Sequence, residues 1–333
     1  MNAGAEKLFL RVIATLVLVC TGSLVNAATM DDDGRALVSS AQVTILSSNL
    51  ANGAAVGEWG LSALVQADGN CILFDAGRYP DTVIRNAEVL GVDLSCITDV
   101  VLSHFHFDHT TGLIPLIENL RQINPDAISR VHVANGFFNE RRANGGSSIR
   151  SNQMINERSQ IEALGVEFVV HDEAAEIYPG VWVSGPVERR HPETNYGTAI
   201  EVSLDGEWVR DHLPESQALV IRTEEGPIVL LGCGHSGVVN ALSQIQDQIQ
   251  DEAIHALMGG LHLFAASDET LQWTGDMLKD IGVENLMAGH CTGIEPLIRL
   301  RASLELSRRT AVVGAVGSRF VLGEGIYPTA IAM

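Results

Sequence analysis

Basic residues are scarce in this chain of 333 residues. Lys and Arg number 21, against 41 Asp and Glu, so the formal net charge is -20. Such a surface repels nucleic-acid backbones and anionic membranes, which excludes nonspecific nucleic-acid binding. A local basic pocket can still attract a small anionic molecule, because nearby charges act on a site more strongly than the distant sum. We therefore expect a small-molecule substrate and no nucleic-acid partner. No pattern in the sequence indicates an oligomeric state.

Cysteine is also sparse, with five residues in the whole chain. Cys20 lies in the N-terminal apolar segment described below. The other four are too few for a disulfide framework in a chain of this size: Cys71, Cys96, Cys233 and Cys291. Cys233 and Cys291 adjoin histidine-rich motifs. A disulfide between these two is one interpretation, and two free thiols are the other.

The N-terminal apolar run lacks the length needed to span a bilayer comfortably. This run, Val12 to Val19, follows Lys7 and Arg11 and precedes the small-residue sequence Val25-Asn-Ala27. The pattern predicts a signal peptide over 1–27, a flexible mature N-terminus over 28–41, and export to the periplasm or the medium. No stable membrane insertion is expected after cleavage. A retained N-terminal anchor is the alternative.

No Gly-x-Gly-x-x-Gly or phosphate-binding lysine loop follows a predicted strand, so nucleotide-binding folds gain no support. Strands and helices alternate instead. Strands are predicted over 42–48, 60–66, 68–75, 99–103, 131–134, 166–170, 218–223, 227–231 and 285–288, and helices over 81–90, 112–120, 155–164 and from Val238. Each half of the chain has a hairpin, a histidine loop and a helix. This layout predicts an α/β fold over 42–333, a single domain in which two sheets face each other and helices lie outside.

The segment His104-Phe-His-Phe-Asp-His109 places four metal-binding side chains directly after a predicted strand. Imidazole nitrogen and carboxylate oxygen are ligands that zinc, manganese and iron accept. Residues two apart share one face of an extended segment, so His104 and His106 should bind one ion. Asp108 and His109, at the start of the next helix, should face a neighbouring position. The spacing predicts two divalent transition-metal ions, zinc being expected and manganese or iron the alternatives, with a catalytic role for Asp108.

The region from Leu102 to Leu113 resembles the signature of the metallo-β-lactamase superfamily, an HxHxDH element followed by glycine, and 72–77 resembles the strand before it. Four segments are similar to the branch named after dihydropterin ribofuranosylaminobenzene phosphate synthase: Glu58–Ser62, Leu231–Gly237, Gly259–Leu263 and His290–Gly293. Together the matches span nearly all of the predicted mature chain. The resemblance implies the metallo-β-lactamase fold, an αββα sandwich of two mixed sheets with helices on the outer faces.

The resemblance also implies which downstream residues complete the metal centre. His235 would join His104 and His106 on one ion, and His290 would join Asp108 and His109 on the other. His262 stands where the superfamily usually has a bridging aspartate; it would either bind metal or act as a catalytic proton donor to the substrate. Cys233 is either a metal ligand or a small buried residue.

Further residues are expected around this centre. Asp75 would accept a hydrogen bond from a ligand or cap a turn, and Glu58 would bind substrate. Arg189 and Arg190 suit an anionic substrate group, or they lie on the solvated surface. The glycine-rich stretch 135–151 is predicted as a long mobile loop, either a lid or a surface excursion.

The branch usually has glycine and tyrosine where this chain has Phe105 and Phe107, and a glycine where it has Thr111. These bulkier residues would reshape the substrate pocket and leave the metal ligands unchanged. The expected function is a dinuclear hydrolase, in which a metal-bound hydroxide attacks an ester, lactone, amide or phosphoester. A transferase like the branch synthase is one alternative, and a non-catalytic metal-binding or sensing protein is another.

Overall fold

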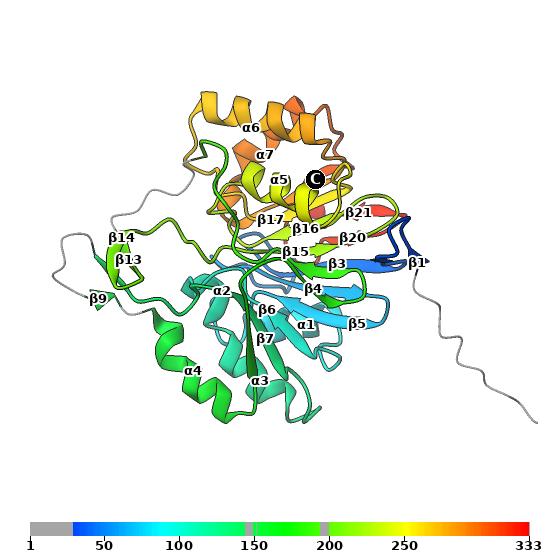
Figure 1. Ribbon diagram of the computed structural model, residues 1–333. Helices are drawn as coiled ribbons and strands as arrows, with labels where there is room; N and C mark the ends of the chain where they lie inside the picture. The colour runs from blue at the N-terminus through cyan, green and yellow to red at the C-terminus, as the bar shows by residue number, and fades with distance from the viewer. Residues whose placement is uncertain (1–28, 144–148, 151, 194–199, 333) are drawn as a thin grey trace, which may run out of the picture.

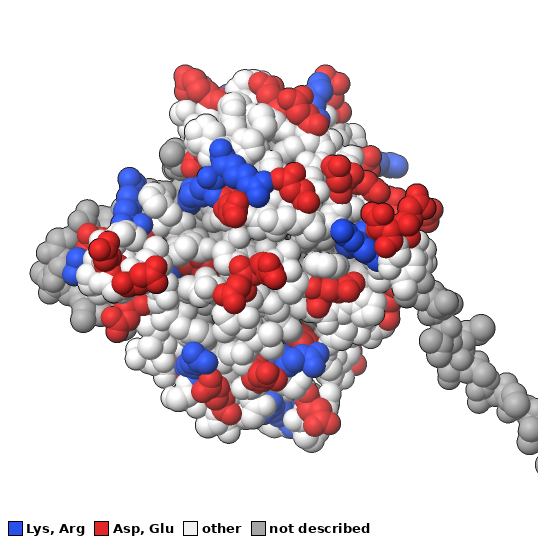
Figure 2. Space-filling view, viewed as in Figure 1, with Lys and Arg blue, Asp and Glu red and all other residues white. Residues whose placement is uncertain are grey.

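Figure 1 shows a computed structural model of the chain, which describes residues 29–143, 149–150, 152–193 and 200–332. The predicted signal peptide, 1–27, lies outside the described residues. Among the helices that are described, none has the length and apolar character needed to cross a membrane. On the face shown in Figure 2, acidic side chains are spread widely and basic side chains form fewer groups.

Two large mixed sheets form the centre of the molecule. The first has the order β10 (Glu167–His171), β7 (Arg130–Ala134), β6 (Asp99–Val101), β5 (Asn70–Phe74), β4 (Ser62–Ala67), β3 (Ala41–Ser47), β20 (Arg319–Val321) and β21 (Gly325–Tyr327). The second has the order β11 (Ala175–Tyr178), β12 (Val181–Val183), β15 (Ala218–Ile221), β16 (Ile228–Leu231), β17 (Ala256–Gly259), β18 (Leu286–Ala288) and β19 (Ala311–Val313). In each sheet an antiparallel part adjoins parallel strands, β10-β7-β6-β5 in one and β16-β17-β18-β19 in the other.

Helices cover the outer face of each sheet, as Figure 1 shows: α1 (Thr82–Leu90), α3 (Leu113–Leu120) and α4 (Gln153–Ala163) on the first, and α5 (Val238–Gln248), α6 (Asp268–Ile281) and α7 (Ile294–Ser303) on the second. Three buried apolar clusters result, one between the sheets and one beneath each group of helices. Local sequence fixes the helix ends. In α6, Ser267 accepts a hydrogen bond from the backbone of Thr270, and Gly282 ends the helix in the left-handed conformation. The αββα sandwich predicted from the sequence is confirmed.

A small four-stranded sheet beside the sandwich was not predicted. It consists of β14 (Glu207–Arg210), β13 (Ile200–Leu204), β8 (Arg141–Ala143) and β9 (Ile149–Arg150). The stretch 135–151, expected to be one mobile loop, therefore contains two strands. Arg141 is buried and forms ion pairs with Asp211 and Glu215. These strands are short and pair with partners distant in the chain, so local pattern does not reveal them.

The segment predicted as a flexible N-terminus is packed in its described part, from residue 29. It forms a hairpin of β1 (Thr29–Met30) and β2 (Ala36–Leu37). Ala36 and Leu37 are buried, and Arg222 donates a hydrogen bond to the Ala36 carbonyl oxygen and pairs with Asp31. Contacts with an arginine nearly two hundred residues away stabilise this segment, and its own composition gave no sign of them.

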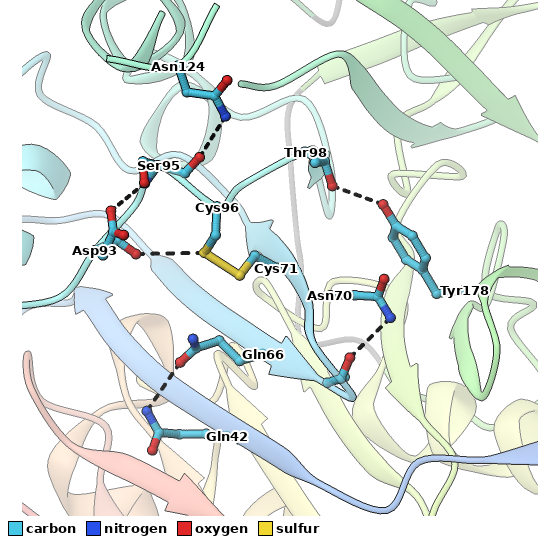
Figure 3. Close-up of a disulfide and its surroundings, with 11 residues drawn as sticks. Gln42, Gln66, Asn70, Cys71, Asp93, Ser95, Cys96, Thr98, Asn124 and Tyr178 are labelled. Atoms are coloured by element: carbon cyan, nitrogen blue, oxygen red, sulfur yellow. Dashed lines mark hydrogen bonds between the residues drawn. A yellow bond between two sulfur atoms is a disulfide. The ribbon is translucent and has the colours of Figure 1, made fainter. Parts of the chain in front are cut away.

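One disulfide joins Cys71 to Cys96, whose Cα atoms are 5.6 Å apart (Figure 3). Cys71 lies near the start of β5, and Cys96 precedes β6, so the bond closes a loop that contains α1. A closed loop of this length typically stabilises a fold by about 3 kcal/mol. Cys233 and Cys291 are both free and buried, so the disulfide considered between them is not formed in this structure.

Candidate metal centre

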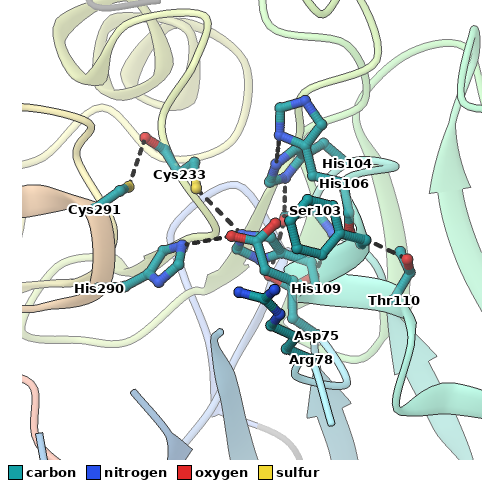
Figure 4. Close-up of polar contacts among 12 residues, drawn as sticks. Asp75, Arg78, Ser103, His104, His106, His109, Thr110, Cys233, His290 and Cys291 are labelled. Carbon is teal, nitrogen blue, oxygen red and sulfur yellow. Dashed lines mark hydrogen bonds and ion pairs between the residues drawn. The ribbon is translucent and has the colours of Figure 1, made fainter. Parts of the chain in front are cut away.

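The predicted metal ligands lie at the carboxyl ends of parallel strands from both sheets (Figure 4). Asp75 follows β5, and the 104–109 segment follows β6 and includes the short helix α2 (Phe107–Thr110). In the second sheet, the loop after β16 carries Cys233 and His235, and His290 follows β18. Crevices at such strand ends are frequent ligand sites in α/β proteins. The convergence on which the sequence interpretation depended is therefore present.

His104, His106 and His235 form the first ligand group. The Nε2 atom of His104 lies 2.9 Å from Nδ1 of His106, and the Nε2 atom of His235 lies 3.2 Å from that same nitrogen. Burial lowers the pKa of His106 to about 3, and burial together with neighbouring histidines lowers the pKa of His104 and His235. Three neutral imidazoles with their nitrogens around one point fit a transition-metal ion.

Asp108, His109 and His290 form the second group. Asp108 Oδ2 lies 3.3 Å from His290 Nε2 and 3.8 Å from His109 Nε2. Burial disfavours the Asp108 carboxylate, yet His109 and His290 outweigh it and hold its pKa below the usual range. The Nε2 atom of buried His290 faces the Asp108 carboxylate, and its Nδ1 atom makes no hydrogen bond to any described residue. Because such atoms normally have partners, this donor set fits a second cation.

Asp75 accepts hydrogen bonds from His109, a predicted ligand, and from Ser103. Of the two roles considered for Asp75, a hydrogen-bond partner of a ligand or a turn cap, this contact matches the first. Its Oδ2 accepts a bond of 2.7 Å from His109 Nδ1 and one of 2.8 Å from the Ser103 hydroxyl, while Oδ1 accepts from the Ser103 backbone at 2.8 Å. Burial opposes a charge on His109, but Asp75 and then Asp108 raise the pKa of this histidine to about 9. Ser103 also lies 2.9 Å from His104 Nδ1. The sequence analysis did not identify this serine, although it directly precedes the motif.

The three residues expected to bind substrate make other contacts. Glu58 is buried and accepts hydrogen bonds from Ser47 and from the backbone of Arg78 and Tyr79. Arg189 donates to the carbonyl oxygens of His235, at 2.6 Å, and of His212, at 2.9 Å. Arg190 pairs at the surface with Glu188 and Asp247. None of the three is among the described residues that line the cavity. Their positions do not support the prediction that these three residues bind substrate.

Hydrogen bonds with residues outside the cavity lining hold the turn that carries His235. Besides the bond from Arg189, the buried Glu193 carboxylate accepts hydrogen bonds from the backbone of Val239 and Asn240, at the start of α5. Gly237 has φ 101, which favours glycine, and a side chain there would collide with Glu193. Glu193 was missed because nothing in its local sequence links it to a helix more than forty residues away.

A cavity of about 490 Å³ opens over the two ligand groups. Its wall includes the aromatic rings of Trp59, Phe105 and Phe107, and its floor includes His106, Asp108, Cys233, His235 and His290. His262 also lines it, with its ring 4.5 Å from that of His235. Neither group of described residues able to hold a metal ion includes His262. Its position suits contact with a bound molecule.

Comparisons with known proteins agree with this arrangement. The profile of the Metallo-beta-lactamase superfamily matches residues 60–141. The chain is 29% identical over 244 residues to 7,8-dihydropterin-6-methyl-4-(beta-D-ribofuranosyl)-aminobenzene-5'-phosphate synthase of Methanocaldococcus jannaschii, covering 71% of this chain and 81% of that protein. It is also similar to the solved structure of Tm1679, a metal-dependent hydrolase of the beta-lactamase superfamily, with 26% identity, a TM-score of 0.65, and coverage of 80% and 94%. YhfI of Bacillus subtilis, a metallo-beta-lactamase fold protein, shares the fold at 13% identity and a TM-score of 0.51, with coverage of 85% and 99%.

These matches, together with the sandwich, show that the chain has the metallo-β-lactamase fold and is similar to members of the metallo-β-lactamase superfamily. Among these proteins it resembles the dihydropterin ribofuranosylaminobenzene phosphate synthase, as the four segments similar to that branch indicated.

Proposed function

We propose that this protein is a dinuclear metallohydrolase that acts on a small molecule with an ester, lactone, amide or phosphoester bond. The observation that carries the proposal is the meeting of two ligand groups, each built from residues of both sheets, beneath one cavity. Nitrogen and carboxylate donors of this kind suit zinc, manganese or iron. When bound, a pair of such ions acidifies water to give a nucleophile at neutral pH and polarises the bond to be cleaved.

The chain's own residues position these groups and the substrate. Asp75 fixes the tautomer of His109 by accepting its Nδ1 proton, so that Nε2 faces the centre. We assign His262 the role of proton donor to the leaving group, because it lines the cavity and is only partly exposed. Trp59, Phe105 and Phe107 add an apolar surface to the lining of the cavity.

The charge of the cavity wall bears on the substrate. Arg141 is the cation among the described residues that line the cavity, and its charge is matched by Asp211 and Glu215. Its guanidinium also lies 3.8 Å over the ring of Phe105. A substrate with an apolar group beside the bond to be cleaved fits this wall better than a highly phosphorylated one. Hydrolysis is therefore our first choice over the synthase reaction of the M. jannaschii relative.

Export from the cytoplasm belongs to the same proposal. The Cys71–Cys96 disulfide supports it, since structural disulfides persist mainly in oxidising compartments. The acidic balance of the chain, at -20, supports a small-molecule partner over nucleic acid.

The test combines metal analysis with a hydrolase screen on protein purified from its native compartment. We expect two equivalents of transition metal and turnover of at least one ester, lactone, amide or phosphoester, lost in His106→Ala and Asp108→Ala. Less than one equivalent of metal would contradict the two-ion proposal. Bound metal without any turnover would favour a sensing protein. Product formed only when a second, acceptor substrate is added would favour the transferase.

A further inference from the structure

The Cys233 side chain lies between the two ligand groups and is close to both. Its Sγ atom, with His104 and His235, forms one set of potential ligand atoms lying within 4.8 Å of one another, and with His109 and His290 it forms another. It is also only 3.2 Å from His109 Nε2 (Figure 4). One sulfur atom is therefore within reach of both metal positions.

The backbone around Cys233 is built for this close approach. A side chain at Gly232 would come within 1.9 Å of the Ser103 hydroxyl, and one at Gly260 within 2.8 Å of the Cys291 sulfur. Gly234 has φ +60, in the left-handed region that glycine adopts without strain. These glycines let the loop after β16 press against the histidine motif of the other sheet, which brings the sulfur into the centre.

The carboxylates of the centre do not fill this bridging place. Both oxygens of Asp75 accept hydrogen bonds from Ser103 or His109. Asp108 faces His109 and His290, which belong to the second group alone. The superfamily usually bridges its two metals with an aspartate, and the described residues of this centre place a thiol there instead.

We propose that the Cys233 thiolate bridges the two metal ions in place of an aspartate. Binding of the ions displaces the thiol proton to solvent, as it does for other cysteine ligands. A thiolate is a softer ligand than a carboxylate, so it favours zinc or iron over manganese. The imidazole and carboxylate ligands accept zinc, manganese or iron alike, and a thiolate ligand would reduce this choice to zinc or iron. The proposed bridge rests on the two-metal site of the proposed function and adds a ligand to that site.

Cys291 supplies a matched control. Cys291 is buried like Cys233, but its Sγ lies 3.7 Å from the Cys233 carbonyl oxygen. It belongs to neither group of described residues that could hold a metal ion. If Cys233 were only a packing residue, replacing either cysteine by serine would have similar effects on metal binding.

The experiment is reconstitution of metal-free protein with Co²⁺, followed by absorption spectroscopy. We expect a sulfur-to-cobalt charge-transfer band in the near ultraviolet that grows until two equivalents are bound. The band should be absent in Cys233→Ser and retained in Cys291→Ser. A band complete at one equivalent would overturn bridging, because it indicates a ligand to a single ion. Wild-type protein with two bound Co²⁺ ions and no such band would overturn the proposal altogether.

A second measurement guards against misfolding of the serine variant. Cys233→Asp restores the usual carboxylate, so it should bind two ions and shift the Mn²⁺-to-Zn²⁺ affinity ratio toward manganese by at least about tenfold. An unchanged ratio in a folded Cys233→Asp protein would count against the thiolate bridge. The two proposals fail separately: a charge-transfer band without turnover contradicts the hydrolase, whereas turnover with two ions and no band contradicts the bridge.

Discussion

Two clusters of buried histidines adjoin β6 of the first sheet, one of them completed by histidines of the second sheet, and their ring nitrogens make different contacts. At the centre described above, Nδ1 of His290 has no hydrogen bond to any described residue, and ring nitrogens of the first group lie within about 3 Å of one another, at 2.9 and 3.2 Å. At the other cluster, Nε2 of His132 on β7 donates a hydrogen bond of 2.9 Å to the Asp99 carboxylate. Nδ1 of the same ring lies 2.9 Å from Nε2 of His171. Arg130 and Tyr178 complete the contacts of Asp99.

Comparing the contacts of the two clusters distinguishes a candidate metal centre from a polar core. Asp99 begins β6 and His104 follows the same strand, so the two clusters flank one short strand. Around Asp99, each buried donor finds an acceptor in the chain, and the network needs no ligand. Around His104, the nitrogens of His104, His106 and His235 face one another and not a carboxylate. Both clusters are buried, so it is this convergence of imidazoles that favours a cation site at the first one.

The largest expected effect separates the clusters by metal content. His290→Ala should lose one of the two ions and lower kcat/KM by at least about a hundredfold, beyond the 10–100-fold typical of residues that only support a ligand. His132→Ala should keep both ions, because its partners are Asp99 and His171. Elemental analysis and kinetics of the two purified variants check this. Equal metal loss in both would remove the distinction between the clusters.

A smaller effect concerns stability. Asp99→Ala leaves the partly exposed Arg130 and the buried His132 without their shared carboxylate; breaking a buried pair such as His132–Asp99 typically costs about 3 kcal/mol. Urea unfolding should show this loss in the free energy of unfolding, while the folded variant retains two ions. A decrease below about 1 kcal/mol would mean that the network contributes little to the fold.

The smallest effect is a pH dependence of stability. Burial, followed by the neighbouring His132, lowers the pKa of His171 to about 4. Between the usual histidine value of about 6.5 and this value, the unfolded chain binds the proton and the folded chain does not, so stability falls as pH falls through that window. His171→Leu should reduce the acid loss by at most about 2 kcal/mol, after a discount for partial exposure. Thermal melts of both proteins at pH 7 and pH 4.5 measure the difference, and parallel curves would contradict it.

The fold could be predicted because its signals are local. The succession of short apolar strands and helices, with a histidine loop after a hairpin in each half, indicates the sandwich, and the structure confirms it. The meeting of His235 and His290 with the 104–109 segment followed from the position of each at a strand end. Their roles as ligands stay predictions, although the geometry places them together.

What the sequence did not reveal depends on distant partners. The Cys71–Cys96 bond joins two residues whose pairing no local pattern indicates, and the small sheet pairs β8 with β13, nearly sixty residues away. Arg189 was assigned to substrate because arginine pairs suit anions, but its donors are used by the His235 and His212 carbonyl oxygens. Such contacts arise only once the two halves of the chain have packed together.

The covalent bond between Cys71 and Cys96 lies at the ends of β5 and β6 opposite to the metal ligands. The far ends of the same two neighbouring strands lead to Asp75 and His104. Because the strands are tied at one end and hydrogen-bonded along their length, neither can slide past the other. The strand ends that carry Asp75 and His104 therefore keep their relative position without any ligand, so the fold itself sets this edge of the proposed metal site.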